Sequence, residues 1–519
     1  MAALLAAALL GPPAPAQAQA QAPDPAASGD SAAGSTPAKT TKVVDLANRY
    51  RFTERYARDD ERETPAGAIG PYRMGLVEVT RETVDSPQGA PRKSETTRQT
   101  IFVERPAEQV GLGVVSGSVR SFERFRLRPE DPSRTMGARP LEGLTVYYRP
   151  KVGDLPLVLS LTEGRKLTEY EFDAITRQVF APHMASILPP QPVRVGDSWR
   201  IPRRAAQAIL GDVGIQGDTL IGKFAGLAKE VDGPRLVASV AISGRVTAAS
   251  GETAVNAEAL FTFTPEGRPR PDAPGAGPGR PADEVVEARG AITELRLARA
   301  TGGPLPGPGR LRYQSSRELT VHRQLGLVAN APALPLPKLP ASASAAADDA
   351  RLTLIEPSGR FSFEHPQDLL PPDRAQLAPA VAGKVALLRV RREGMDLLQV
   401  ELVPKPLGIE ALKARLAAEY GKAAKMEIIQ GAEEWLPEAD WPRMKVYRID
   451  AAAKVPDRAQ GAPSAQPRTH FDAYLLLPGQ AVSVIAIATT TRDAVAPFRR
   501  EVEQILKSLQ IDPARPKVE

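Results

Sequence analysis

Cysteine is absent from the 519 residues, and histidine occurs only four times. Without a thiol the chain cannot form disulfides, Cys-ligated zinc or iron–sulfur sites, a thiol nucleophile or a lipid anchor on an N-terminal cysteine. No two of the histidines stand at the spacing of a HExxH or HxH metal pair; they are His183, His322, His365 and His470. The sequence therefore predicts no metal centre and no cofactor, and no catalytic residue set is found.

Aromatic residues and unbalanced charge are also scarce. Aromatics make up 5% of the chain, so aliphatic side chains must fill its cores. The net charge of +6 comes from 67 basic and 61 acidic residues that are interspersed along the chain, which predicts no nucleic-acid partner. No later apolar run reaches the length of about 20 residues that a membrane-spanning helix needs. We therefore expect no integral membrane segment after removal of a signal peptide.

The first 20 residues have the pattern of a signal peptide. An apolar run from Ala2 to Leu10 precedes small-x-small cleavage frames around Ala16 to Ala20, which predicts export to the periplasm or beyond the cell. A signal peptide usually has a basic residue before its apolar run, but the first basic residue here is Lys39. The alternative interpretation is a disordered Ala/Pro-rich tail. Residues 21–41 are rich in Ala, Pro and Ser and are expected to be disordered.

From residue 42 to residue 328 apolar and polar side chains alternate with a period of two. This pattern predicts strands with one wet face, joined by Pro/Gly turns. Among these strands we place RKLTEYEFD, residues 165–173, and we expect a helix only around residues 175–187. The Pro/Gly-rich stretch 266–282 is expected to be a loop. The segment is predicted to form an antiparallel β-rich half-barrel or closed barrel.

A Pro/Ala-rich stretch, residues 329–350, is predicted to link this domain to a second one at residues 351–513. Strands there alternate with two amphipathic helices. The first lies in GIEALKARLAAEYGK, with Ile409, Leu412, Leu416 and Tyr420 on one face and Gly421 as its C-terminal cap, and the second is terminal. The apolar stripe of the terminal helix comprises Val495, Phe498, Val502, Ile505 and Leu509. We therefore expect an α+β multidomain chain whose second domain is an antiparallel sheet covered by helices.

Two motifs of this second domain carry a family resemblance. It opens with G-x-F-x-F-x-x-P, from Gly359 to Pro366, and closes with Phe498, Ile505, Ser508 and Leu509 at characteristic spacing. In this order the motifs resemble the PsbP/Mog1-like α/β/α sandwich family over residues 353–512. After Pro366 the chain departs from the family pattern, because Gln-Asp-Leu replaces an expected aromatic. The resemblance implies a binding or accessory role and transfers no site residue.

The stretch LPPQPVRVGDSWRIP contains Gly-Asp-Ser, so Ser198 is a candidate nucleophile. A GDS-type esterase places this triplet near the mature N-terminus and supplies a late D-x-x-H motif, and both are missing here. The alternative G-x-S-x-G elbow needs glycine where Arg200 stands. A structural role explains more residues: Gly196 and Asp197 form a turn, and Trp199 re-enters a strand with its side chain in the core.

The same stretch resembles the V-x-x-G-D-x-W signature of uncharacterised secreted bacterial proteins rich in antiparallel strands. The resemblance implies a fold and an extracytoplasmic setting. It implies no biochemical role.

Residues 433–440 form a second candidate site. Carboxylates cluster beside two tryptophans in GAEEWLPEADWPRM: Glu433, Glu434, Glu438 and Asp440 beside Trp435 and Trp441. Such a pair is typical of glycosidases only when both carboxylates line one cleft, so we interpret the segment as a solvated loop anchored by tryptophans. Two functional classes stay open. One is a non-catalytic extracytoplasmic protein that binds an apolar small molecule or a protein partner; the other is a hydrolase using Ser198 or the acidic loop.

Overall fold

The structure is a computed structural model of the whole chain. It describes residues 40–43, 48–54, 71–85, 91–110, 114–129, 141–151, 154–162, 164–210, 215, 217–230, 234–248, 251–266, 285–304, 312–325, 350–356, 358–371, 383–391, 394–418, 427–454, 469–479, 482–491 and 494–511. The predicted signal peptide, most of the segment predicted to be disordered, most of loop 266–282 and the linker up to residue 349 lie outside these ranges. Residues 40 and 41, which were predicted to be disordered, belong to a strand. No helix in the described ranges is long and apolar enough to cross a membrane.

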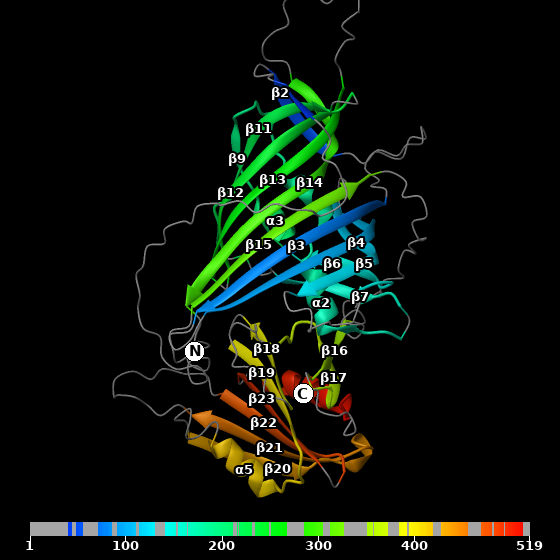
Figure 1. Cartoon of the computed structure of the whole chain (residues 1–519). Helices are drawn as coiled ribbons and strands as arrows, with labels where there is room; N and C mark the ends of the chain where they lie inside the picture. The colour runs from blue at the N-terminus through cyan, green and yellow to red at the C-terminus, as the bar shows by residue number, and fades with distance from the viewer. Residues whose placement is uncertain are drawn as a thin grey trace, which may run out of the picture.

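The first half of the chain builds one large twisted sheet (Figure 1). In the described residues it has 14 strands, of which 11 follow the order β1-β11-β12-β13-β14-β15-β3-β4-β5-β6-β7. All pairs are antiparallel except β2 with β14. The strands are β1 (Thr40–Val43), β2 (Arg49–Glu54), β3 (Tyr72–Asp85), β4 (Arg92–Val110), β5 (Val114–Pro129), β6 (Thr145–Lys151), β7 (Asp154–Ser160), β9 (Ser198–Arg200), β10 (Gly217–Asp218), β11 (Ile221–Glu230), β12 (Leu236–Ala248), β13 (Gly251–Glu266), β14 (Val285–Pro304) and β15 (Arg312–Gln324).

The prediction of a β-rich antiparallel architecture is confirmed, and of the two predicted forms the sheet takes the open one. Its path runs from β1 to β7 without closing on itself. One short segment nevertheless joins distant strands, because Val193 exchanges two backbone hydrogen bonds with Tyr50 of β2 while β9 pairs with β11. Residues 193–200 therefore tie β2 to β11 across the core.

Three short helices lie against the core face of the sheet: α2 (Glu169–Thr176), the 3-10 helix η2 (Ala181–Ile187) and α3 (Arg203–Leu210). We call these helices with the connection between the first two, residues 169–187 and 203–210, the plug. The prediction that residues 165–173 form a strand was wrong, since only β8 (Leu167–Thr168) is extended there. The Thr168 hydroxyl accepts a hydrogen bond from the Glu171 amide, and the Glu171 carboxylate accepts one from the Thr168 amide, so a capping box starts α2.

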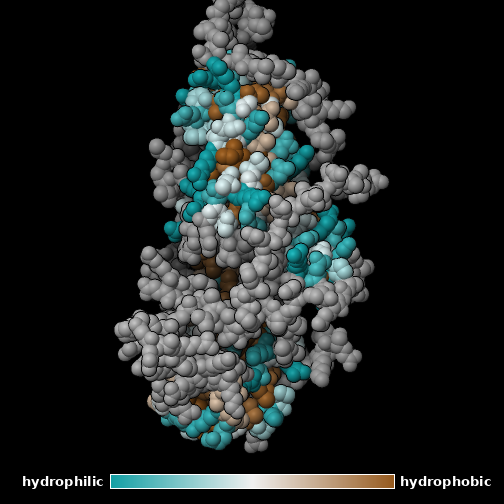
Figure 2. Space-filling view, turned by 90° about the vertical axis from the view of Figure 1, so that its left-hand side faces the viewer, coloured by the Kyte–Doolittle hydropathy of each residue, from teal (hydrophilic) through white to brown (hydrophobic). Residues whose placement is uncertain are grey.

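Alternation of side chains explains which face of the sheet meets the plug. Along β11 buried and exposed residues alternate, and the buried ones join a core that continues into the plug. One end of this core is aromatic: Phe52 lies 5.3 Å from both Phe224 and Phe261, ring centroid to centroid. The described surface seen in Figure 2 is mostly hydrophilic, with apolar side chains in small separate groups. The long strands therefore bury one face and leave the other wet.

The second half of the chain contains two smaller sheets. In the described residues the first has the order β24-β17-β16-β8 and the second β18-β19-β23-β22-β21-β20. The larger sheet packs α6 on one face and α5 on the other, each over its own apolar cluster. The elements are β16 (Arg351–Ile355), β17 (Phe361–Pro366), β18 (Lys384–Arg391), β19 (Gly394–Val403), α5 (Ile409–Leu416), β20 (Glu427–Trp435), η4 (Glu438–Asp440), β21 (Lys445–Lys454), β22 (Thr469–Leu477), β23 (Ser483–Thr491), α6 (Val495–Lys507) and β24 (Gln510–Ile511).

The two halves are joined through β8, which pairs in parallel with β16. Next to this pair, the side-chain amide of Gln367 bonds to both the N–H and the C=O of Val158 in the edge strand β7. His365 is fully buried, and its Nε2 lies 2.9 Å from a carboxylate oxygen of Glu169, the first residue of α2. The start of the plug is therefore in direct contact with the second half of the chain.

Candidate functional site

The Gly-Asp-Ser stretch forms the turn that its sequence predicts. Gly196 has φ +100°, a conformation that glycine adopts without strain. The Asp197 carboxylate accepts a hydrogen bond from the Arg194 amide at 2.8 Å, and the backbone of both turn residues bonds to Phe224. The turn therefore leads directly into β9 and fixes the register of β9 against β11.

Ser198 and Trp199 point to opposite sides of β9. Ser198 is exposed, whereas the Trp199 ring packs on the large core and donates its indole N–H to the Ile187 carbonyl at 2.8 Å. Gly222, across from it on β11, leaves room for the ring, because a Cβ there would lie 2.9 Å from the indole and from Ile201. The predicted structural role of the tryptophan is confirmed.

No histidine makes a contact with Ser198 within the described residues. His183 lies inside the core, with Nε2 3.1 Å from the Val115 carbonyl and 2.5 Å from the Arg204 guanidinium. Burial and the Arg204 charge lower the pKa of His183 to about 4. The remaining three histidines lie on β15, β17 and β22: His322, His365 and His470.

The acidic segment is not the loop that its sequence suggested. Glu433 and Glu434 belong to strand β20, where they pair with β21, and only Glu438 and Asp440 lie beyond it in η4. Glu433 accepts a hydrogen bond from the Tyr447 hydroxyl at 2.6 Å and pairs with Lys413 at 2.8 Å. Glu434 pairs with Arg448. Both carboxylates thus have cationic partners.

The two tryptophans of this segment have different surroundings. The Trp441 side chain is buried below Lys507, whose ammonium lies 5.3 Å from the ring centroid. Trp435 is 50% exposed and stands edge-on to Tyr447. Trp441 therefore anchors the segment as predicted, and Trp435 does so only in part.

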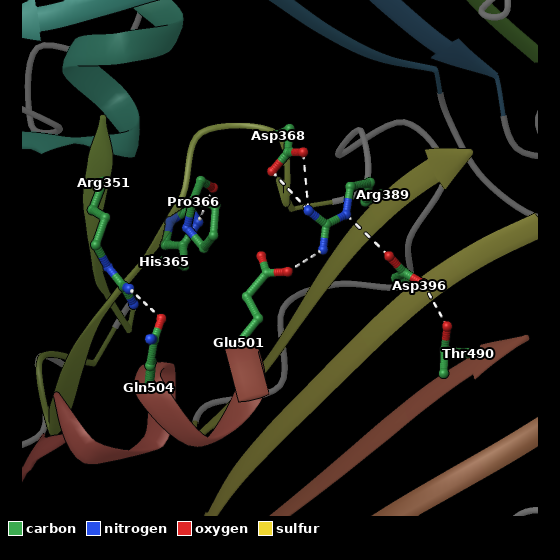
Figure 3. A network of polar contacts seen from close by, with 9 residues as sticks. All are labelled: Arg351, His365, Pro366, Asp368, Arg389, Asp396, Thr490, Glu501 and Gln504. Atoms are coloured by element: carbon green, nitrogen blue, oxygen red, sulfur yellow. Dashed lines mark hydrogen bonds and ion pairs between the residues drawn. The ribbon is translucent and has the colours of Figure 1, made fainter. Parts of the chain in front are cut away.

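A dense ion network lies where β18, β19 and α6 meet (Figure 3). The Arg389 guanidinium donates to Asp396 at 3.0 Å, to both oxygens of Asp368 and to Glu501 at 2.6 Å. Thr490 of β23 donates to Asp396 at 2.6 Å. Burial alone would lower the pKa of Arg389, but its bonds to Glu501 and Asp368 raise it. Because all three guanidinium nitrogens donate to carboxylates, one of them on α6, the network fastens α6 to the sheet.

A second network is fully buried between the large sheet and the plug. Arg120 of β5 and Glu104 of β4 are cross-strand partners with no exposed side-chain surface, joined at 2.8 Å. Glu104 also accepts hydrogen bonds from Tyr72 at 2.8 Å and Ser118 at 2.5 Å. The other side of Arg120 faces the plug, where Nη2 donates to the Val179 carbonyl at 3.1 Å.

Two further arginines of the sheet bond to carbonyl oxygens at helix ends in the plug. Arg317 of β15 donates to the Arg177 carbonyl at the end of α2, at 3.0 Å, and Arg299 of β14 donates to the Leu210 carbonyl at the end of α3, at 3.2 Å. The last carbonyls of a helix lack partners within the helix and carry partial negative charge, so a guanidinium is a favourable donor to them. The plug is thus attached to the sheet by arginine side chains as well as by apolar packing.

A carboxylate balances part of this positive charge. Glu78 of β3 pairs with Arg98 and with Arg317. Burial alone would raise the pKa of Glu78, but the charges of Arg317 and Arg98 outweigh it and lower the pKa below its usual value. The Glu78 carboxylate thus links β3 to β4 and β15 through two arginines.

The sequence analysis did not single out these arginines, although a signal was present. Arg120 stands two residues before Phe122, and Glu104 stands two residues after Phe102, so each charge falls on the buried side of an alternating strand. A charged residue at an apolar position of a strand is the signal that points to this network.

Comparisons with known proteins add little to this geometry. No protein-family profile and no curated protein matches the chain. Among solved structures, a lipovitellin structure titled for its lipid–protein interactions aligns at TM-score 0.26 and 9% identity, over 54% of this chain and 28% of its own. This chain thus spans little more than a quarter of the lipovitellin chain.

Two further structures align at lower scores. A LolA superfamily protein from Nitrosomonas europaea aligns at TM-score 0.12 and 8% identity, over 52% of this chain and 91% of its own. The outer membrane protein OprD from Pseudomonas aeruginosa aligns at TM-score 0.13 and 9% identity, over 82% of this chain and 93% of its own. Scores this low establish no shared fold.

Proposed function

We propose that this chain is an exported, non-catalytic binding protein that holds an apolar or amphipathic ligand between the core face of its large sheet and the plug. The plug consists of helices of 8, 7 and 8 residues. Isolated helices of this length are unstable in water, so their order depends on what they pack against. In α3 three of the buried residues are alanines, Ala205, Ala206 and Ala208, which bury little apolar surface each.

One observation carries the proposal: arginines of the sheet donate to backbone carbonyls of the plug, the buried Arg120 to Val179 and Arg317 to Arg177, and the partly buried Arg299 to Leu210. A carbonyl oxygen is a weaker partner for a guanidinium than a carboxylate or phosphate oxygen. A ligand that supplies such oxygens and an apolar chain can compete with the plug for the same donors and the same apolar face.

The second half of the chain is proposed to serve as an accessory, partner-binding unit of the PsbP/Mog1-like kind. In support, its six-stranded antiparallel sheet carries α5 on one face and α6 on the other. Its contact with Glu169 at the start of α2 gives it a direct connection to the plug. The periplasmic or secreted setting is proposed from the signal-like first 20 residues.

The absence of cysteine allows a direct test by thiol labelling. Ala206→Cys places one thiol in α3 at a fully buried position, and Ala473→Cys places another at a fully buried position of β22 as a matched control. A buried thiol reacts slowly with a maleimide. We expect added oleate to accelerate labelling of the α3 thiol and to leave the β22 thiol unchanged.

The same protein is titrated with oleate and with oleyl alcohol by calorimetry. Saturable binding of either one supports the proposed function. If neither amphiphile binds, or if both thiols become reactive together through general unfolding, the proposed function is wrong.

A further inference from the structure

The Arg120 guanidinium has an incomplete set of partners although it is fully buried. Its Nε donates to Glu104 at 2.8 Å and its Nη2 to the Val179 carbonyl at 3.1 Å. Its Nη1 has no hydrogen-bond partner among the described residues. A buried donor of a charged group that is left unpaired keeps its full cost of desolvation, so this one calls for an explanation.

Glu104 does not need the outer edge of Arg120. Its two oxygens also accept from Ser118 and Tyr72, which together with Nε of Arg120 satisfy the carboxylate from the sheet side. The outer edge of a guanidinium, formed by Nη1 and Nη2, presents two parallel N–H groups that match the two oxygens of a carboxylate or phosphate. Here Nη2 donates to a single neutral carbonyl of the plug, and Nη1 has no hydrogen-bond partner in the part of the chain that the structure describes.

Aromatic rings surround this edge. The Arg120 guanidinium carbon lies 4.3 Å from the Tyr148 centroid, 5.0 Å from that of Phe102 and 5.7 Å from that of Phe180. Phe180 belongs to the plug, next to Val179, and the other two rings belong to the sheet. An oxyanion bound here would lie in a low-dielectric site, where its bonds to a guanidinium are strongest, while an apolar chain attached to it would lie against the rings.

We propose that Arg120 recognises the acidic head group of an amphipathic ligand, a carboxylate or phosphate at the end of an apolar chain, whose oxygens replace the Val179 carbonyl on Nη2 and fill Nη1. This inference rests on the proposed function and specifies its ligand class. It predicts that the protein distinguishes ligands by their head groups and that this discrimination depends on one arginine.

The test compares three probes with similar chains: oleate, dioleoyl phosphatidate and oleyl alcohol, titrated against the full-length protein. Wild type should bind at least one acidic probe more tightly than the alcohol, and the order of oleate and phosphatidate identifies the preferred head group. In Arg120→Met we expect the affinity for the acidic probe to fall by about 10- to 100-fold, the effect of losing charged hydrogen bonds, and the affinity for oleyl alcohol to stay unchanged.

Arg323→Met serves as the matched control. Arg323 is equally buried, pairs with Glu54 at 2.6 Å and stacks 4.3 Å from the Tyr72 ring centroid. This variant should retain the head-group preference of wild type. Arg120→Lys keeps the positive charge but lacks the two parallel N–H groups of the guanidinium, so it should retain only part of the head-group preference.

The outcomes separate the two proposals. If wild type binds oleyl alcohol as tightly as both acidic probes, Arg120 does not read a head group, although the ligand-binding function stands. If Arg120→Met weakens all three probes equally, the arginine acts only on the fold and the inference is wrong. If Arg120→Met fails to fold, the inference is tested by the order of affinities in wild type and by the Arg120→Lys variant. Wild type should prefer an acidic probe, and Arg120→Lys should lose part of that preference.

Discussion

The indole of Trp199 packs over Gly222, which lies directly opposite it on β11. A methyl group at position 222 would approach the ring to 2.9 Å, and the indole N–H bonds to the Ile187 carbonyl. The ring therefore fixes the distance between β9 and β11 and connects both to η2.

Truncation of this ring should destabilise the first half of the chain. We expect Trp199→Ala to cost about 3 kcal/mol, the lower end for a large aromatic because the ring is only partly buried. Gly222→Ala should cost about 1–3 kcal/mol through overpacking against the ring. Ser198→Ala should change stability by no more than about 0.5 kcal/mol, because its side chain is exposed. Urea unfolding of the three variants measures these differences, and a Trp199→Ala protein as stable as wild type would contradict the structural role of the ring.

The Ser198→Ala variant also tests the alternative hypothesis that the protein is a hydrolase with Ser198 as its nucleophile. A panel of ester substrates is assayed with wild type and Ser198→Ala at equal concentration. We expect no activity that disappears with Ser198. An esterase activity lost in this variant at unchanged melting temperature would make Ser198 a nucleophile after all.

His183 should make stability depend on pH. Its pKa is about 4 in the folded chain and 6.5 in the reference state, so the unfolded chain takes up the proton first as the pH falls. The contribution of neutral His183 is complete above pH 6.5 and is lost as the pH falls towards 4, at up to about 1.4 kcal/mol per pH unit. His183→Gln cannot titrate, so its free energy of unfolding should fall less steeply over this window. Parallel pH slopes for the two proteins would show that His183 is solvated.

Arg389 should contribute strongly to the stability of the second half of the chain. It is the common partner of Asp368, Asp396 and Glu501, and its side chain is 13% exposed. Replacing it by methionine removes the guanidinium that the three carboxylates share. We expect Arg389→Met to destabilise the second half of the chain by about 3–5 kcal/mol, as breaking buried pairs does.

A matched control exists on the wet face of the large sheet. Arg81 also pairs with two carboxylates, Glu95 and Glu318, but its side chain is 48% exposed. Arg81→Met should cost no more than about 1 kcal/mol. Thermal unfolding of both variants measures the difference, and equal small losses would show that the Arg389 network is solvated and contributes little.

Separate expression of residues 40–328 and 350–519 tests the predicted domain boundary. We expect each piece to fold and the two to bind each other, because β8 pairs with β16 and Gln367 bonds to both backbone groups of Val158. Gln367→Ala should weaken the association, as seen by gel filtration of the mixed pieces. A piece that fails to fold alone, or two that never associate, would show that the boundary is misplaced or that this contact is weak.

Period-two patterning was sufficient to predict most strands and their wet faces. It succeeds for β13, where buried and exposed residues alternate, because each strand has one face on the core. The apolar stripe of α6 was predicted for the analogous reason, and Phe498, Val502 and Ile505 are buried as expected. The prediction that Trp199, and not its neighbour Ser198, faces the core also followed from the alternation of side chains along a strand.

The plug and its arginines were harder to predict. Helix α2 was assigned to a strand because its apolar residues also fit a period of two, although the capping box of Thr168 and Glu171 marks a helix start. Helix α3 was not predicted, because three of its five buried residues are alanines, which mark an apolar face only weakly. The pairing of Arg120 with Glu104 depends on register between β4 and β5, with bulges nearby, which a sequence alone does not specify.

The pairing of β3 with β15 has a consequence for how the chain reaches its native state. Residues 73–85 of β3 pair with residues 312–324 on one side, while β1 pairs with residues 227–230 and β2 with residues 285–290, so strands at the start of the chain need partners that are synthesised much later. Contacts between residues so far apart in the sequence slow folding, because closing the long loop costs entropy before the contacts that compensate for it have formed. The chain emerging from the ribosome therefore keeps β1 and β2 without their strand partners for longest, and a component that protects nascent strands should raise its yield.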